Sequence, residues 1–325
     1  DVAQLNVSNV TGSAYILEQN DIELGSVDAD LTYDDHFALH ARNIALGDVD
    51  AQDGLVTLIA SGAIDDDLGD AGENAANFAI DLTARSLYLS AQNGIGATRP
   101  IETSAQSILR AVTATNDIAL TNVSDVDTVV GELAVTSISG AGDITFDQAG
   151  AGDVTFNDVF TPDGDIRLST DASDLTAVFV QTLRGDIAAV SGDDLFVRDI
   201  VNAANGDVVL TAERNLVLEG ESSVTASDTA MLFSGADTLM GGESRVQADV
   251  VVMAAEGNLK MATASVVWGY SEVDITAANA VIELIQSGTG MALTGGMVSI
   301  TATEGSITVN TDDAAADIVA DEVVL

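Results

Sequence analysis

Cysteine is absent from the chain, so neither a disulfide framework nor thiol chemistry can contribute to its structure or activity. Basic residues are scarce as well: 10 lysines and arginines stand against 52 acidic residues, which gives a formal net charge of −42. Nucleic acids and anionic membrane surfaces are bound mainly through lysine and arginine. No run of residues approaches the roughly 18 uninterrupted apolar positions of a membrane-spanning helix. We therefore expect no nucleic-acid partner and no insertion into a membrane.

Aromatic residues and proline are also rare, at 4% and two residues respectively, although 47% of the chain is hydrophobic. The apolar content is therefore mostly valine, isoleucine, leucine and alanine. Small β-branched residues can fill a stack of identical layers by packing on their own copies, whereas an irregular globular core usually needs large aromatics. The same β-branched content argues against a disordered acidic chain. The composition favours a repetitive β structure.

A short phrase recurs along the chain: Gly-Asp or Asn-Asp, followed by alternating apolar and polar residues. It occurs in the ranges 116–120, 142–146, 152–156, 164–168, 185–189 and 206–210. One series of strand starts advances by about 21 residues at each step and consists of Ile144, Ile166, Ile187 and Val208. A second series advances by nearly the same step and consists of Leu175, Leu195 and Leu216. Two interleaved series with one period indicate a structural repeat.

The residue types within this phrase predict its conformation. Glycine or asparagine permits a positive φ in the turn, and aspartate can accept hydrogen bonds from nearby backbone N–H groups. The alternation then places aliphatic residues and phenylalanine on one face of a strand and threonine or arginine on the other. A unit of about 20 residues cannot bury its apolar face alone, so the units must stack as coils. We expect an all-β parallel β-helix, or β-solenoid, with about 15 coils of roughly 20–22 residues each.

The repeat is not equally regular throughout the chain. Residues 110–325 carry regular repeats, whereas residues 1–110 are less regular and contain an acidic loop near residues 65–74. No linker separates these parts, so we expect one continuous solenoid over residues 1–325. The sequence opens at Asp1 without methionine and stops within a strand-like run at Leu325. We therefore expect it to be a fragment of a longer chain.

Two phrases resemble a known family of repeats. They are Gly-Asp-Val-Val-Leu-Thr-Ala-Glu-Arg-Asn-Leu-Val-Leu at residues 206–218 and Val-Ser-Ile-Thr-Ala-Thr-Glu-Gly-Ser-Ile-Thr-Val at residues 298–309. Both are similar to the repeats of filamentous-haemagglutinin-like exoproteins and of large autotransporter passengers. The resemblance covers residues 110–325 well and the first third weakly. It implies a single-stranded, right-handed parallel β-helix that is secreted to or beyond the surface of a Gram-negative bacterium.

The acidic loop is the main candidate metal site. Its carboxylates are supplied by Asp65, Asp66, Asp67, Asp70 and Glu73. Crowded carboxylate oxygens repel one another unless a cation lies between them, and hard oxygen ligands of this kind suit calcium. The alternative is an acidic loop that is simply solvated. We expect calcium as the one candidate cofactor, and we single out no catalytic or other cofactor-binding residue.

Two further groups of residues could bind a metal, but each also has a simpler structural interpretation. His36 and His40 could share a face and bind a transition metal, but the remaining ligands of a structural zinc site are not evident. A polar strand edge is the plainer interpretation. Asp48, Asp50 and Asp53 resemble half of an EF-hand loop, but their spacing slips by one residue and the closing glutamate is absent.

An enzyme on the same scaffold is the main alternative class. Polysaccharide hydrolases of this shape use clustered aspartates as acid and base. The aspartate pairs at 193–194 and 312–313 are adjacent in sequence, and adjacent strand residues point to opposite faces, which argues against a shared site. Trp268 and Tyr270 would share one strand face, either as a core or interface pair or as a sugar-stacking pair. We therefore expect that the chain is not an enzyme.

The leading hypothesis is a structural and adhesive segment of a secreted bacterial surface filament or giant adhesin, used for attachment, aggregation or matrix building. Continuous backbone ladders would give a stiff rod, and an acidic surface would prevent sideways aggregation. Open coil ends would pair with further repeats or further copies of the chain, end to end. Cell-surface glycans or receptors on host or neighbouring cells are the other expected partners. The alternatives are a fibre or sheath subunit that stacks end to end and a carbohydrate-active enzyme.

Overall fold

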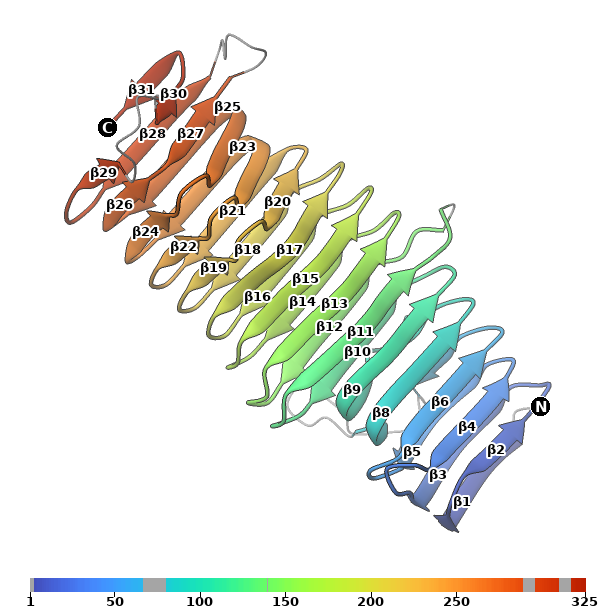
Figure 1. Ribbon diagram of the computed structural model, residues 1–325. Coiled ribbons are helices and arrows are strands. Elements are labelled where there is room, and N and C mark those ends of the chain that lie inside the picture. The colour runs from blue at the N-terminus through green and yellow to red at the C-terminus, as the bar shows by residue number, and fades with distance from the viewer. Residues whose placement is uncertain (1–2, 67–79, 139, 289–295, 310–316) are drawn as a thin grey trace. The chain divides into compact units, whose positions relative to one another are not determined.

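The computed structural model describes residues 3–66, 80–138, 140–288, 296–309 and 317–325. The chain falls into two compact units, Asp1–Asp171 and Ala172–Leu325. Every regular element among the described residues is a β-strand, and the strands form about 13 turns of a parallel β-solenoid. Figure 1 shows strands of successive coils lying side by side within each unit. The described residues contain no helix that could cross a membrane.

Strands β1 to β14 belong to the first unit. Their bounds are β1 Ala3–Thr11, β2 Ala14–Leu17, β3 Ile22–Asp30, β4 His36–Ala41, β5 Ile44–Asp50, β6 Leu55–Ala60, β7 Ile64–Asp66, β8 Leu82–Ala91, β9 Ile101–Thr113, β10 Ile118–Val123, β11 Thr128–Val135, β12 Ile144–Ala149, β13 Val154–Thr161 and β14 Ile166–Thr170.

Strands β15 to β31 belong to the second unit. Their bounds are β15 Leu175–Thr182, β16 Ile187–Ser191, β17 Leu195–Ala203, β18 Val208–Ala212, β19 Leu216–Leu218, β20 Ser223–Ala226, β21 Thr229–Ser234, β22 Thr238–Met240, β23 Arg245–Ala255, β24 Asn258–Met261, β25 Val266–Ala277, β26 Asn279–Ile282, β27 Leu284–Ser287, β28 Met297–Ala302, β29 Ile307–Val309, β30 Ile318–Val319 and β31 Glu322–Val324.

Within each unit, residues that are one predicted repeat period apart are partners in neighbouring strands. Parallel pairs join Ile144 to Ile166 in the first unit, and Ile187 to Val208, Leu175 to Leu195 and Leu195 to Leu216 in the second. Each strand therefore lies on its own copy from the neighbouring coil. The predicted all-β parallel β-solenoid is confirmed.

Alternation along each strand builds the core. Ile166 and Leu168 of β14 are buried, whereas Arg167 between them is exposed. Phe146 and Phe156 are fully buried, and their rings meet edge to face with centroids 5.1 Å apart. Burying one such side chain stabilises a fold by about 1.5–3 kcal/mol. An aliphatic column thus fills each unit, and in the first unit it includes a few aromatic rings.

Some coils are longer than the period of about 21 residues that the sequence predicts. In these coils the register partners are farther apart along the chain: Ile64 pairs with Ile95, Ile118 with Ile144, and Val273 with Val298. Solenoids tolerate such insertions because only the strands must stay in register. The expectation of about 15 coils was therefore too high, since the described residues form about 13 turns.

Aspartate side chains connect the turns of successive coils, in an arrangement that we call the aspartate ladder. In the first unit, Oδ1 of Asp117 accepts a hydrogen bond from the backbone N–H of Asp143 at 2.9 Å, and Oδ1 of Asp143 accepts one from Asp165 at 2.8 Å. In the second unit, Oδ1 of Asp186 accepts a hydrogen bond from the N–H of Asp207 at 2.9 Å. The predicted role of the turn aspartates is confirmed: they satisfy backbone N–H groups of the next coil.

Glycine precedes most of these aspartates, though not Asp117, for a steric reason. Gly164 has a φ of +153°, and a Cβ atom at this position would lie 2.2 Å from the carbonyl oxygen of Gly142 in the preceding coil. No real Cβ can approach an oxygen so closely. The turn backbones of neighbouring coils therefore stack tightly only if the side chain is absent.

A polar network lies inside the first unit, in a column that is otherwise apolar. Asn122 is fully buried, and its Oδ1 accepts hydrogen bonds from the N–H of Ala105 and the hydroxyl of Thr103, both at 2.9 Å. Its Nδ2 donates to Oγ1 of Thr128 at 3.0 Å and to Oε1 of Gln148 at 2.9 Å. The side chain is fully satisfied, as a buried amide must be.

Candidate functional site

Asp65 and Asp66 are the members of the predicted calcium loop that the structure describes, and both belong to β7. Three members lie outside the described residues: Asp67, Asp70 and Glu73. Oδ1 of Asp65 accepts a hydrogen bond from the backbone N–H of Thr98 at 3.3 Å. The side chain of Asp66 is only 1% exposed, and Nη1 of Arg99 lies 3.6 Å from its Oδ2. Asp66 is therefore a buried carboxylate at the end of a strand.

Two acidic residues that the sequence did not single out lie close to Asp66. Asp81, directly before β8, is 1% exposed, and its Oδ2 accepts a hydrogen bond from the backbone N–H of Glu102 at 2.8 Å. Its Oδ1 is buried and has no hydrogen-bond partner among the described residues. Burial, together with the negative charges of Asp66 and Glu102, raises the pKa of Asp81 to about 9. These three carboxylates form what we call the Asp81 cluster.

The coil period is the signal that could have found this cluster. Asp81 and Glu102 are one coil period apart along the chain, and the next residues, Leu82 and Thr103, are partners in parallel register. Strands β7 and β8 both pair with β5, so Asp66 at the end of β7 and Asp81 just before β8 lie along the same strand. The coil stacking therefore places Asp66 and Asp81 along one strand and Asp81 beside Glu102, but it does not bring the three carboxylates together as a group of metal ligands.

His36 and His40 lie in β4, where His36 is partly buried and His40 is exposed. The backbone N–H of His36 donates a hydrogen bond to Oγ of Ser13 at 3.0 Å. Neither histidine belongs to a group of three potential metal ligands within the part of the chain that the structure describes. The surroundings fit the plainer interpretation of a polar strand edge.

The EF-hand-like aspartates lie around the turn between β5 and β6. Asp48 and Asp50 are residues of β5, and Oδ1 of Asp50 accepts a hydrogen bond from the N–H of Gln52 at 3.0 Å. The N–H of Gly54 donates to the carbonyl three residues earlier at 2.9 Å. Asp53 is exposed in the same turn. The EF-hand-like residues thus form a tight turn, which the side chain of Asp50 stabilises by a hydrogen bond.

In the second unit, Asp193 and Asp194 lie in the turn before β17 and not within a strand. The prediction that their side chains point to opposite faces is therefore wrong, because Nε of Arg214 lies 2.7 Å from Oδ1 of Asp193 and 2.8 Å from Oδ1 of Asp194. Asp174 joins the pair, and one oxygen of each aspartate lies within 4.8 Å of the others. The bound guanidinium already compensates part of their charge. The second adjacent pair, 312–313, lies outside the described residues.

Trp268 and Tyr270 share one face of β25, as the strand spacing predicts. Their ring centroids are 5.3 Å apart with an angle of 49° between the planes. The indole N–H of Trp268 donates to the carbonyl of Gly288 at 3.3 Å, and Nε2 of Gln247 donates to the hydroxyl of Tyr270. Both rings are half-buried and held by neighbouring coils.

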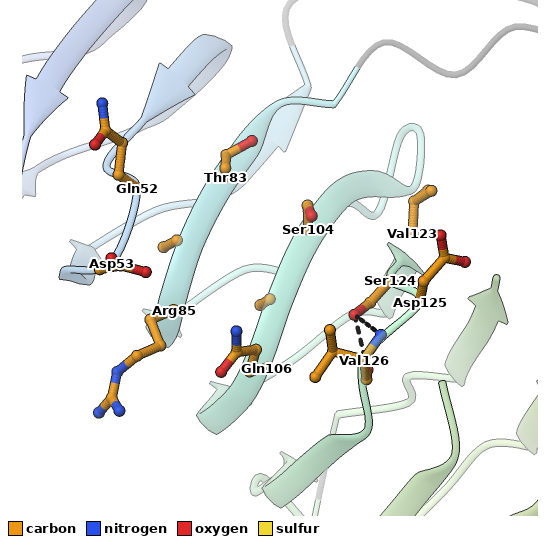
Figure 2. Close-up of a pocket in the computed structure, with 12 residues that line it drawn as sticks. Gln52, Asp53, Thr83, Arg85, Ser104, Gln106, Val123, Ser124, Asp125 and Val126 are labelled. Carbon is orange, nitrogen blue, oxygen red and sulfur yellow. Dashed lines mark hydrogen bonds between the residues drawn. The ribbon is translucent and has the colours of Figure 1, made fainter. Parts of the chain in front are cut away.

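A polar groove of about 320 Å³ crosses the surface of the first unit. Figure 2 shows that its lining comes from strands β8 and β9 and from two turns, and the lining residues include Gln52, Asp53, Thr83, Arg85, Ser104, Gln106, Ser124 and Asp125. The guanidinium carbon of Arg85 lies 3.4 Å from the ring centroid of Tyr33, which is a cation–π contact. Amide, hydroxyl and charged groups along the groove can hydrogen-bond a polar ligand such as a sugar.

No protein-family model, curated protein or solved structure matches this chain. The parallel β-solenoid is therefore established by the structure itself, whereas the family resemblance of the repeat phrases stays a hypothesis.

Proposed function

We propose that the chain is a structural and adhesive segment of a secreted bacterial surface filament or giant adhesin of the filamentous-haemagglutinin type. The observation that supports this role best is the register of parallel strands from coil to coil, exemplified by the pairing of Leu195 with Leu216. Each coil is hydrogen-bonded to the next along its strands, so a load applied to the solenoid is shared by many bonds. Resistance to bending and pulling is the property that a surface filament needs.

The charge of the chain supports the same role. The cores of both units are apolar, and most of the 52 acidic residues lie in turns or on outward strand positions. A net charge of −42 makes neighbouring molecules repel one another sideways. Outward-facing strand surfaces of a long β-solenoid would otherwise be prone to association, so repulsion keeps individual filaments apart.

The polar groove of the first unit is the surface that we assign to contact with glycans. Its carboxylate, amide and hydroxyl groups suit the many hydroxyls of a sugar, and the small residues Ala84 and Ala105 also line it. Asp53 and Asp125 line it together with a single arginine, Arg85. Because this lining and the chain as a whole are acidic, neutral rather than anionic sugars are the expected ligands.

The proposed role can be tested on cells that produce the protein. Antibodies raised against residues 172–325 should label intact cells, and protease added from outside should remove this label. Cells that carry an in-frame deletion of residues 1–325 should attach less to a glycan-coated surface and to one another. Labelling that appears only after lysis would contradict the location, and unchanged attachment and aggregation would contradict the adhesive role.

A further inference from the structure

A hollow of about 400 Å³ lies on the surface of the second unit, where strands β18, β21, β23 and β25 end. Successive coils contribute its lining, which includes Thr211, Phe233, Ala254, Glu256, Thr276 and Thr303. Small-ligand sites are clefts of this size, with mostly apolar walls and a few polar groups that orient the ligand. The hollow therefore has the size of a ligand site, and it shares no lining residue with the polar groove of the first unit.

The register of the strands produces the hollow. Phe233 pairs with Thr211 on one side and with Ala254 on the other, and Ala254 pairs in turn with Thr276. The residue before each of these four in its strand is buried, so the four side chains point outward. Coils stack at roughly 4.8 Å, so a phenyl ring that lies beside a methyl group has one side left uncovered.

The ring of Phe233 forms the main apolar wall of the hollow. It is half-buried and makes no contact with another ring or with a cation among the described residues. The face of an aromatic ring is electron-rich and attracts weakly polarised C–H groups, such as those of a sugar ring. Three alanines, Ala212, Ala254 and Ala255, add only methyl groups to the lining. This part of the hollow thus suits a small apolar group that lies next to a sugar ring.

Polar groups with free hydrogen-bonding capacity line the same hollow. The hydroxyls of Thr211 and Thr276 and the carboxylate of Glu256 have no hydrogen-bond or ion-pair partner within the described part of the chain. A threonine hydroxyl can donate and accept, whereas an ionised carboxylate only accepts. Together these groups can bind a ligand that presents an N–H donor and a carbonyl acceptor beside a methyl group. An acetamido group has this combination.

We propose that the hollow binds a neutral sugar that carries an acetamido group, such as an N-acetylhexosamine unit of a glycan. The methyl group of the ligand would lie among the alanines, its ring against Phe233, and its N–H would donate to Glu256. The same carboxylate and the net charge of −42 disfavour anionic sugars. The inference rests on the proposed adhesive role, to which it adds a second contact surface with a defined ligand.

A second copy of the chain is the other occupant that an apolar wall could bind. Two copies would each bring a net charge of −42, and each would present Glu256 at the contact, so their approach is opposed electrostatically. A neutral sugar meets no such repulsion. The hollow therefore fits the sugar better, and the molecular mass in solution separates the two occupants.

The test is calorimetric titration of the 325-residue chain with two sugars. The probes are the trisaccharide of N-acetylglucosamine and the methyl glycoside of N-acetylgalactosamine, each compared with its counterpart that has a hydroxyl in place of the acetamido group. At least one acetamido sugar should bind at least about tenfold more tightly than its counterpart. Ser104→Trp fills the polar groove of the first unit and should leave this affinity unchanged.

Substitutions in the hollow should weaken this binding at least about tenfold. Phe233→Ala removes the ring, and Ala254→Trp fills the space beside it. The matched controls are Met231→Ala and Val252→Trp, at outward positions of the same two strands that do not line the hollow, and they should bind as the wild type does. Light scattering should give the same molecular mass for the wild type and Phe233→Ala.

Equal affinity for the acetamido sugars and their counterparts, or equal losses in the hollow variants and their controls, would overturn the inference. A lower mass of Phe233→Ala would overturn it in favour of contact between copies. Loss of binding in Ser104→Trp would assign the sugar to the polar groove, so that the inference fails while the proposed adhesive role stands. Absence of binding to any sugar, together with unchanged attachment of deletion cells, would contradict both.

Discussion

Oδ1 of Asp194 accepts hydrogen bonds from the backbone N–H of Asn215 at 3.0 Å and from its side-chain Nδ2 at 2.9 Å. The two residues occupy the same turn in successive coils. Nε and Nη2 of Arg214 donate to the same carboxylate, each at 2.8 Å. Burial opposes ionisation of Asp194, but these hydrogen bonds outweigh it, so its pKa is lowered. Stacked acidic turns are thus stabilised by donors from the next coil.

The aspartate ladder should contribute to stability through its acceptor oxygens rather than through its charges. Oδ1 of Asp237 accepts hydrogen bonds from the N–H of Asn258 at 2.7 Å and from its Nδ2 at 3.0 Å. Asp237→Ala removes the acceptor and should lower the free energy of unfolding by about 1–2 kcal/mol. Asp237→Asn keeps an acceptor and should cost less. Urea denaturation of both variants measures the difference, and equal losses would show that the hydrogen bond contributes nothing.

Much of the fold could be predicted from the sequence because the same aliphatic residues show both the length of the repeat and the inward face of each strand. The spacing of Leu175, Leu195 and Leu216 gave the register directly, and Gly-Asp gave the turns. The buried amide of Asn122 could not be predicted. It stands in the run Thr121-Asn122-Val123, and nothing in that run shows that Gln148 and Thr128 come from other strands to satisfy it.

The buried polar network predicts that a substitution of Asn122 lowers the stability of the fold strongly. Replacing Asn122 with leucine removes the acceptor of the Ala105 N–H and the donor to Oε1 of Gln148 inside the core. Asn122→Leu should therefore lower the free energy of unfolding by at least about 3 kcal/mol. Gln106→Leu removes an exposed amide from β9 and should change it little. If chemical denaturation gives similar values for the two variants, the network is not a significant source of stability.

Acid should weaken the first unit partly through Asp21. Arg42 donates hydrogen bonds from Nε at 2.6 Å and from Nη2 at 2.5 Å, and these are the main cause that lowers the pKa of Asp21 to about 2. The folded state then binds fewer protons than the unfolded state between the two pKa values. The stabilising contribution is therefore full above pH about 4 and is lost as the pH falls through about 2.

Thermal unfolding between pH 5 and pH 2 checks this expectation for Asp21. The Tm of Asp21→Asn should fall less steeply with decreasing pH than that of the wild type, because the variant has no carboxyl group to protonate. Asp30→Asn, at an exposed position, should retain the wild-type slope. Parallel curves for the wild type and Asp21→Asn would show that the ion pair with Arg42 does not contribute.

The polar groove provides a direct test of glycan contact. Ser104 lines the groove from β9, so Ser104→Trp should fill it and reduce retention on neutral oligosaccharide beads at least about tenfold. Thr145→Trp adds the same side chain at an outward position of β12 and serves as the matched control. Binding that survives Ser104→Trp, or that both variants reduce equally, would exclude the groove as the contact surface.

The carboxylates of the Asp81 cluster could be predicted only in part from the sequence. The acidic loop was predicted from local crowding, and among its described members only Asp66 belongs to the buried cluster. Asp81 and Glu102 were missed because each is a single acid in an otherwise ordinary run. They converge only once strands β8 and β9 are placed in register. The local composition thus indicates an acidic surface, but the register between coils determines which carboxylates are neighbours in the folded protein.

One coil is the structural unit from which the parallel β-solenoid is built. Val208 pairs with Ala230, Leu216 with Thr238 and Ser223 with Arg245, and the step along the chain is the same in all three pairs. Deleting residues 208–229 therefore removes one whole coil and offers the next coil to the same partners. Deleting residues 208–218 removes half a coil and leaves the strands out of register.

Circular dichroism and thermal melting of these two deletion variants test whether a coil is the structural unit. We expect the whole-coil deletion to keep the β-sheet spectrum and a cooperative melt close to that of the wild type, whereas the half-coil deletion should lose much of both. Loss of structure in the whole-coil deletion, or equal behaviour of the two variants, would contradict it.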